Sequence, residues 1–291
     1  MKTIHRLLLG LVIAFGLSAG AQAKGESNII RVGGSAALLP VIAQCAKNFM
    51  EGHGTWDKAD PSLPAEKIVI YVSGGGSGTG VKSVLNKTLD IGLVSRFVKD
   101  KEKELLGDHK TYLVGKDAVV IAARNDNLLV QAASGLTSAK LAKILSGEMA
   151  TYKAAGVAAD KPIVLVVRDA GAGSAELVQE KVMGDKSISP WALWLPSQGA
   201  LLKKLESNPL AIGYISSGLV LGSDKLKAFK LDGIDPTNEN VINGTYPIAR
   251  PLMMVVQGEA TKHQQRFIDY VLGDKGQAIF TANHYVPAVV K

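Results

Sequence analysis

The sequence predicts a mixed α/β protein built on mainly parallel sheets, and three observations lead to this fold class. Short runs of β-branched and aliphatic residues alternate with helical patterns along almost the whole chain, as in folds whose strands are joined by crossover helices. The 291 residues are 47% hydrophobic, which is too apolar for a disordered chain and enough for one large or two medium domains. No linker rich in Pro, Gly or Ser separates two consecutive parts, so two domains would share more than one crossing segment.

The N-terminus has the three parts of a secretory signal peptide. Lys2 and Arg6 form a positive region, residues 7–17 form an apolar run, and a stretch of small residues ends at Ala23. This pattern predicts cleavage after Ala23 and export, most simply to a bacterial periplasm. The apolar run is too short for a good spanning helix, and a retained membrane anchor is the alternative.

The first part of the mature chain alternates predicted strands and helices. The strands are expected at 29–33, 67–72 and 90–93, and the helices at 38–50 and 78–86. The intervening segment 51–66 contains Gly52, Gly54, Pro61 and Pro64, which predicts a loop longer than is usual for such a connection.

The second part continues the alternation. Strands are expected at 118–122, 163–167, 211–215 and 252–256, and helices at 137–146, 174–183, 198–205, 261–272 and 275–282. The run 163–167 is unbroken and apolar, as in a strand that is buried on both faces. Thr137 is placed to cap its helix. Trp191 and Trp194 stand at helical spacing and are expected in the core.

Composition and residue spacing disfavour several classes of protein. One cysteine, Cys45, forms no internal disulfide and excludes Cys-rich metal sites, and its apolar neighbours indicate a buried thiol. The 33 Lys and Arg outnumber the 26 Asp and Glu without the basic run of a nucleic-acid arm. The five histidines lack metal-site spacing. We therefore expect no metal, no cofactor and no nucleic-acid partner.

Three loops place small residues where a predicted strand gives way to a helix. They are residues 33–37, 73–80 and 168–174. Glycine lets the backbone approach a ligand closely, and the unpaired N–H groups and dipole of a helix N-terminus favour an anion. Ser35, Ser77 and Ser174 add hydroxyl donors, and Arg168 adds a planar guanidinium. Each loop alone could be a tight turn or a helix cap, but parallel strands bring their carboxyl ends together at a ligand crevice, so the three predict one anion site.

Known nucleotide and hydrolase motifs do not fit these loops. Gly80 is followed by Val81 and not by lysine, so the second loop is not a Walker A motif, and it also departs from G-x-G-x-x-G and G-x-S-x-G. No base stands beside Ser77 or Ser174, which disfavours an exported phosphatase but leaves it as an alternative.

Further segments carry characteristic sequences. They are GSAALLP (34–40), GSGTGVK (76–82), DIGLVSR (90–96), RDAGAGS (168–174), NPLAIGY (208–214), YPIARP (246–251), GQAI (276–279) and YVP (285–287). Their order and spacing resemble the phosphate-binding proteins of bacterial phosphate ABC transporters, over nearly the whole mature sequence.

The resemblance implies a two-lobed periplasmic-binding-protein fold of type II, each lobe a mainly parallel sheet flanked by helices. Lobe one would comprise 24–113 and 246–291, and lobe two 114–245, with hinge crossings near 112–115 and 243–246. The lobes would close over a ligand in the cleft between them. The implied protein is not an enzyme: it is a monomer that captures inorganic phosphate and delivers it to a membrane-embedded ABC permease.

The resemblance also implies ligand-binding residues. They are Ser35, Ala36 and Ala37 of the first loop, Ser77 and Gly78 of the second, Ser95 and Arg96 after the third strand, and Arg168, Ala172, Gly173 and Ser174 of lobe two.

This sequence departs from the family at several of these positions. Ala36 and Ala37 stand where the first loop often carries Thr, and Ala172 replaces the family's Ser, so hydroxyl donors are lost. Arg96 stands where some members place an Asp acceptor that selects protonated phosphate over sulfate, although other members also have Ser-Arg here. Asp169 is another candidate acceptor. The same fold binding sulfate, a metal oxyanion or a phosphonate is therefore an alternative.

Overall fold

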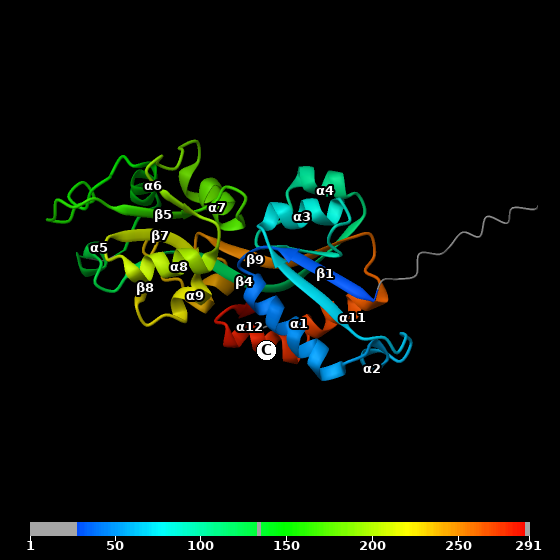
Figure 1. Cartoon of the computed structure of the whole chain (residues 1–291). Coiled ribbons are helices and arrows are strands. Elements are labelled where there is room, and N and C mark those ends of the chain that lie inside the picture. The colour runs from blue at the N-terminus through cyan, green and yellow to red at the C-terminus, as the bar shows by residue number, and fades with distance from the viewer. Residues whose placement is uncertain (1–27, 133–134, 289–291) are drawn as a thin grey trace, which may run out of the picture.

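The computed structural model describes residues 28–132 and 135–288, and these form two groups of elements joined by long strands (Figure 1). The predicted signal peptide lies outside the described residues. Within the described ranges, no helix combines the length and the apolar character needed to cross a bilayer.

The first group contains a parallel set of three strands. These are β1 (Ile29–Gly34), β2 (Val69–Gly74) and β3 (Ile91–Val94), with β1 between the other two. The helices α1 (Leu39–His53), α11 (Lys262–Leu272) and α12 (Asp274–Ala282) cover one face, and α3 (Ser77–Leu85) and α4 (Asp100–Leu106) cover the other (Figure 1). Both β1 and β2 therefore end beside helix N-termini, as the glycine-bearing loops predict.

The second group has the same organisation around β5 (Val164–Arg168). This strand lies parallel to β6 (Leu193–Leu195) and β7 (Ala211–Ser216). Its other elements are α5 (Leu128–Ala132), α6 (Ser138–Ser146), α7 (Gly173–Val178), a π-helical turn η1 (Gln179–Met183), α8 (Gln198–Ser207), α9 (Ser217–Leu221), β8 (Leu226–Ala228) and α10 (Asn238–Ile242).

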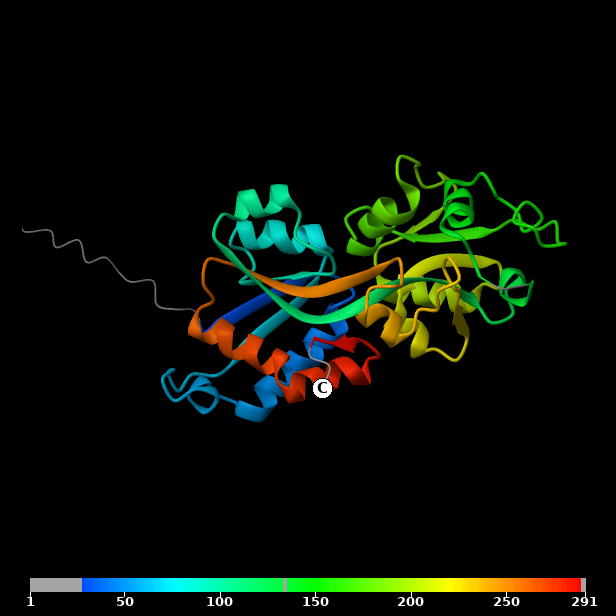
Figure 2. The same ribbon diagram turned by 180° about the vertical axis from the view of Figure 1, so that it is seen from behind.

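Two long antiparallel strands join the groups. β4 (His109–Arg124) pairs with β9 (Ala249–Gln257) as far as Ala118, and then with β7 and β8. The sheet order is β2-β1-β3-β9-β4-β7-β5-β6, and β10 (Val286–Pro287) also pairs with β4. Figure 2 shows β4 and β9 running side by side from one group to the other. The parallel pairs predicted from sequence thus flank an antiparallel centre.

Each group has its own large hydrophobic core. The first core is built from residues of 30–114 and 252–285, among them Trp56, Phe267 and Phe280. The second core is built from residues of 118–248 together with Val286. β4 contributes Val114 to the first core and Val119 to the second, so the chain passes between the cores within one strand.

Two local expectations are wrong. The segment 51–66 is not loop throughout: α1 extends to His53, and α2 (Trp56–Ala59) follows because Trp56 is fully buried and its Nε1 donates to the carbonyl of Asn28 at 2.9 Å. Trp191 and Trp194 are not core residues: 85% of Trp191 and 47% of Trp194 are exposed. Trp194 lies on the short edge strand β6, so its three-residue spacing from Trp191 does not place the two rings on one buried helix face.

Candidate functional site

A small cavity lies where the two groups of elements meet. Its lining residues are Ser35, Ala36, Ala37, Ser95, Arg168, Ala172, Gly173, Ser174, Gln198 and Arg250. All except Gln198 and Arg250 were predicted from sequence. They come from the ends of β1, β3 and β5 and from the chain that enters α8 and β9.

Close backbone approach brings the loops to this cavity. A Cβ on Gly76, where φ is +132°, would lie 2.4 Å from the carbonyl oxygen of Gly171. A Cβ on Gly173 would lie 2.4 Å from Ser77 Oγ and 2.7 Å from Ser95 Oγ. Real Cβ atoms do not occupy such distances, so glycine at both positions is what allows the second and third loops to touch.

Three buried serines, Ser35, Ser95 and Ser174, line the cavity, whereas the predicted Ser77 does not line it and is buried behind Ser95. Ser77 Oγ accepts from the backbone N–H of Ser95 at 3.0 Å and shares a 3.3 Å hydrogen bond with its hydroxyl, so it supports Ser95 from behind. Ser35 Oγ and Ser174 Oγ are buried and make no hydrogen bond among the described residues. An unpaired buried hydroxyl is unfavourable, and both of these line the cavity. They suit a ligand that has several hydrogen-bonding oxygens.

Arg168 is held rigidly at the end of β5. Its side chain is 1% exposed, Nε donates to the carbonyl of Leu195 at 3.0 Å, and Nη2 donates to that of Pro196 at 3.0 Å and to Asp169 at 2.8 Å. Nη1 has no partner among the described residues. The guanidinium that lines the cavity therefore keeps an unused edge for a ligand.

Two lining residues were missed by sequence reasoning. Arg250 stands in the YPIARP segment, whose arginine was given no role, and Gln198 begins α8. Arg250 Nη1 donates to Ser95 Oγ at 3.3 Å, and Gln198 Oε1 accepts from the backbone N–H of Ser216 at 3.4 Å. The Arg-Pro pair that follows the predicted hinge crossing at 243–246 was the available signal for Arg250.

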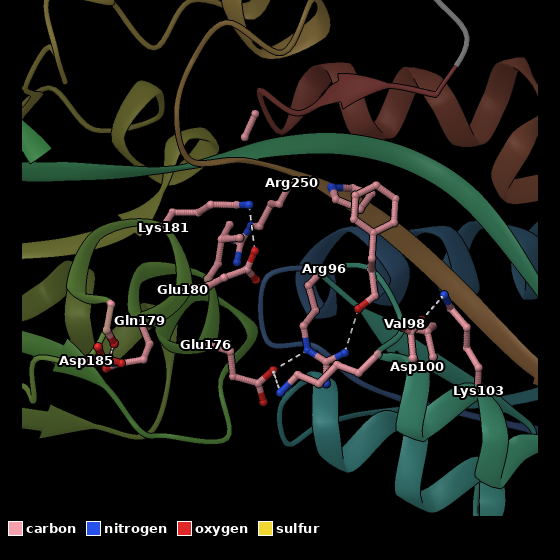
Figure 3. A pocket seen from close by; sticks show the side chains of 16 residues that line it. Arg96, Val98, Asp100, Lys103, Glu176, Gln179, Glu180, Lys181, Asp185 and Arg250 are labelled. Carbon is pink, nitrogen blue, oxygen red and sulfur yellow. Dashed lines mark hydrogen bonds and ion pairs between the residues drawn. The ribbon is translucent and has the colours of Figure 1, made fainter.

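Arg96 and Gly78 do not line the cavity, and neither does Asp169. Figure 3 shows the Arg96 guanidinium paired directly with Glu176, and both residues line a second, larger groove. The same guanidinium also pairs with Glu102 at 2.7 Å. Burial alone would lower the pKa of Arg96, but hydrogen bonds and charges from the two glutamates outweigh it and raise that pKa. Arg96 thus stays charged in an ion pair between the two groups of elements.

The cavity offers donors in place of catalytic groups. Among the described residues, no carboxylate and no histidine lines it, and no cluster of His, Cys, Asp and Glu could hold a metal ion. Two guanidiniums, several hydroxyls and residues of the first and third loops surround a small space. This combination suits the binding of a compact anion.

Comparisons with known proteins agree with this geometry. A family model described as "PBP superfamily domain" matches residues 19–275. The phosphate-binding protein PstS of Bacillus subtilis (strain 168) is 30% identical over 308 residues, which cover 99% of this chain and 95% of that protein. A substrate-binding protein assigned to phosphate ABC transport in Clostridium perfringens, with bound phosphate in its crystal structure, has a TM-score of 0.76 at 28% identity and covers 90% of this chain and 100% of that one. An ABC-type phosphate transport receptor from Vibrio cholerae has the same fold, with a TM-score of 0.69 at 23% identity over 88% of this chain and 99% of its own.

Proposed function

The chain belongs to the PBP superfamily and, within it, to the PstS phosphate-binding proteins, and from this premise we propose that it captures inorganic phosphate and delivers it to an ABC permease. One observation carries the proposal: loops from separate parts of the chain converge with buried hydroxyls and Arg168 on one small cavity. A tetrahedral anion with four oxygens matches such a set of donors.

The proposed ligand groups are those that line the cavity. We assign the first loop's contribution to the hydroxyl of Ser35 and the N–H groups of Ala36 and Ala37. The third loop would supply Arg168 Nη1 and the hydroxyl of Ser174. Ser77 would act by supporting Ser95. Arg96, which is engaged with two glutamates, would contribute to closure of the cleft and not to the anion.

We propose two lobes: 24–113 with 246–291, and 114–245. The separate hydrophobic cores support two lobes but not these exact bounds, because Val114 packs in the first core and Tyr246 and Ile248 pack in the second. The hinge would comprise β4 near 112–115 and the chain at 243–246 before β9. We also propose that the protein acts as a monomer, as the family resemblance implies. The relatives and the sequence pattern at residues 1–23 support export to the periplasm, with cleavage after Ala23, and partnership with a membrane-embedded permease.

Calorimetry with phosphate on ligand-stripped protein tests the proposal directly. Arg168→Ala should weaken binding by about 2–5 kcal/mol, as expected for removal of a buried charged partner. Arg124→Ala is a matched control, because Arg124, like Arg168, pairs with a carboxylate close to it in sequence but lies outside the cavity. A loss below about 0.5 kcal/mol for Arg168→Ala, which is within the effect of an ordinary surface substitution, would show that the cavity is not the site.

Sulfate or a phosphonate is the second candidate ligand. Among the described residues, the carboxylates nearest to the arginines are engaged by them: Asp169 by Arg168 and Asp117 by Arg250. Sulfate, which has no proton to donate, would therefore meet no unpaired carboxylate on the wall. Competition between phosphate and these anions separates the two ligands.

A further inference from the structure

A buried ion pair links β4 and β9 where they pass between the two cores. Asp117 and Arg250 face each other in the antiparallel register. Their side chains are 0% and 1% exposed, and Arg250 Nη2 lies 2.6 Å from Asp117 Oδ2. A pair buried this deeply is unfavourable unless hydrogen bonds satisfy both partners. The hydrogen bonds of each partner therefore show what the pair does.

The Asp117 carboxylate is fully occupied. Oδ2 accepts from Arg250 Nε at 3.0 Å and from Nη2 at 2.6 Å. Ser216 Oγ donates to both carboxylate oxygens, at 3.0 and 2.9 Å, and Ser217 Oγ donates to Oδ1 at 2.9 Å. Asp117 does not line the cavity. It is therefore placed to hold the guanidinium and not to contact an anion.

The hydrogen bonds to Asp117 orient the third guanidinium nitrogen of Arg250, Nη1. Two of the three nitrogens are turned toward Asp117, which leaves Nη1 directed to Ser95 Oγ at 3.3 Å. Both Arg250 and Ser95 line the cavity. Arg168 is arranged in the same way, since Asp169 and two carbonyls hold it and leave one nitrogen unused. Two guanidiniums, each fixed by a carboxylate, thus reach one cavity from different strands.

We propose that Arg250 is a second anion-binding guanidinium and that Asp117 is its positioning residue. The proposal rests on the proposed function, because the ligand is the same tetrahedral oxyanion. It adds a contact from β9, so that the anion touches one of the two strands that join the lobes.

The effect of Asp117 on binding has a diagnostic sign. On electrostatic grounds alone, a carboxylate close to the cavity repels an anion, so its removal should tighten binding. If Asp117 acts by orienting Arg250, its removal should instead weaken binding, because Nη1 is no longer held in place. A purely structural role would lower the thermal stability and leave the affinity of the folded protein unchanged.

The experiment is calorimetric titration of inorganic phosphate into ligand-stripped full-length protein at neutral pH, with thermal unfolding measured on each variant. Asp117→Asn and Arg250→Gln should each weaken binding by at least about tenfold. The double variant should bind no more weakly than Arg250→Gln alone, because Asp117 acts through Arg250. Asp60→Asn is the matched control: it removes a carboxylate from another Asp–Arg pair, outside the cavity, and should change affinity by less than about twofold.

Tighter or unchanged phosphate binding in Asp117→Asn overturns the proposal. The proposal is also overturned if the fold-loss of affinity in the double variant equals the product of the two single losses. If Asp117→Asn does not fold, Arg250→Lys provides the test, because it keeps the buried positive charge but loses the planar fork. Phosphate affinity of Arg250→Lys should fall about tenfold. Wild-type affinity in this variant would refute a ligand role for Arg250. A wild-type protein that binds neither phosphate nor sulfate refutes the proposed function as well, whereas wild-type binding with no effect of Arg250 variants refutes this inference alone.

Discussion

The ion pair between Arg96 and Glu176 should control how fast phosphate leaves. Glu176 lies on α7 two residues after Ser174, and it also accepts Lys99 Nζ at 3.0 Å. In the proposed division, Arg96 and Lys99 belong to lobe one and Glu176 to lobe two, so the pair would exist only when the lobes are together. Replacement of Glu176 by glutamine should therefore destabilise the closed form without removing any group that touches the anion.

The burial of the Arg96–Glu176 pair allows the free-energy cost of Glu176→Gln to be estimated. An exposed ion pair contributes about 0–1 kcal/mol, whereas removing one partner of a fully buried pair costs about 3–5 kcal/mol. The Arg96 side chain is 7% exposed and that of Glu176 is 19% exposed, but Arg96 keeps Glu102 as a partner in the variant. The expected cost is therefore about 1–2 kcal/mol, which corresponds to a dissociation rate about 5 to 30 times faster.

Stopped-flow release of phosphate, followed by tryptophan fluorescence, measures this rate. Trp194 is a suitable reporter because its neighbour Leu195 accepts a hydrogen bond from Arg168. Association should change little, since most effects of interface substitutions appear in dissociation. Glu180→Gln is the matched control, as Glu180 lines the same groove but pairs with Lys181 of its own lobe. Equal dissociation rates for wild type and Glu176→Gln would refute the reasoning.

Three further predictions concern other parts of the structure. Gly173→Ala should weaken phosphate binding by at least about tenfold, because its Cβ would collide with Ser77 Oγ at 2.4 Å and prevent full closure; unchanged calorimetric affinity would contradict this. Burial raises the pKa of the Cys45 thiol to about 12, so alkylation by iodoacetamide at mildly alkaline pH should require unfolding, and rapid labelling of native protein would show otherwise. A backbone hydrogen bond from Ser62 and pairing with Arg266 lower the pKa of Asp60 to about 2. The depressed native pKa gives stability that is present above the unfolded value, near 4, and is lost as pH falls toward 2; thermal unfolding of Asp60→Asn and wild type across this range should therefore converge in acid.

The anion loops could be predicted because their signals are local. A glycine run between a β-branched strand and a helical pattern needs only neighbouring residues to be recognised, and Ser35, Arg168 and Ser174 lie within such runs. The cavity combines these three with partners of the same kind. What the sequence could not give was the direction of a side chain: Arg96 adjoins Ser95, yet it turns toward Glu102 and Glu176.

The central strands were underestimated for a related reason. The longest apolar run in β4 is 118–123, whereas residues 109–117 include His109, Lys110 and Lys116 and give no clear period. Their strand conformation depends on pairing with β9, which is more than a hundred residues away. The Asp117–Arg250 contact spans 133 positions, so it follows from the register of the sheet and not from any motif.

The split composition of the first core governs the order in which this protein can fold. Its members come from residues 30–114 and again from 252–285, and β3 gains its partner β9 only from the later segment. A chain synthesised from its N-terminus could assemble the second core, whose members lie almost entirely in 118–248, while the first still lacks one side. Closing such long loops is slow, so the half that begins the polypeptide would be the last to become native.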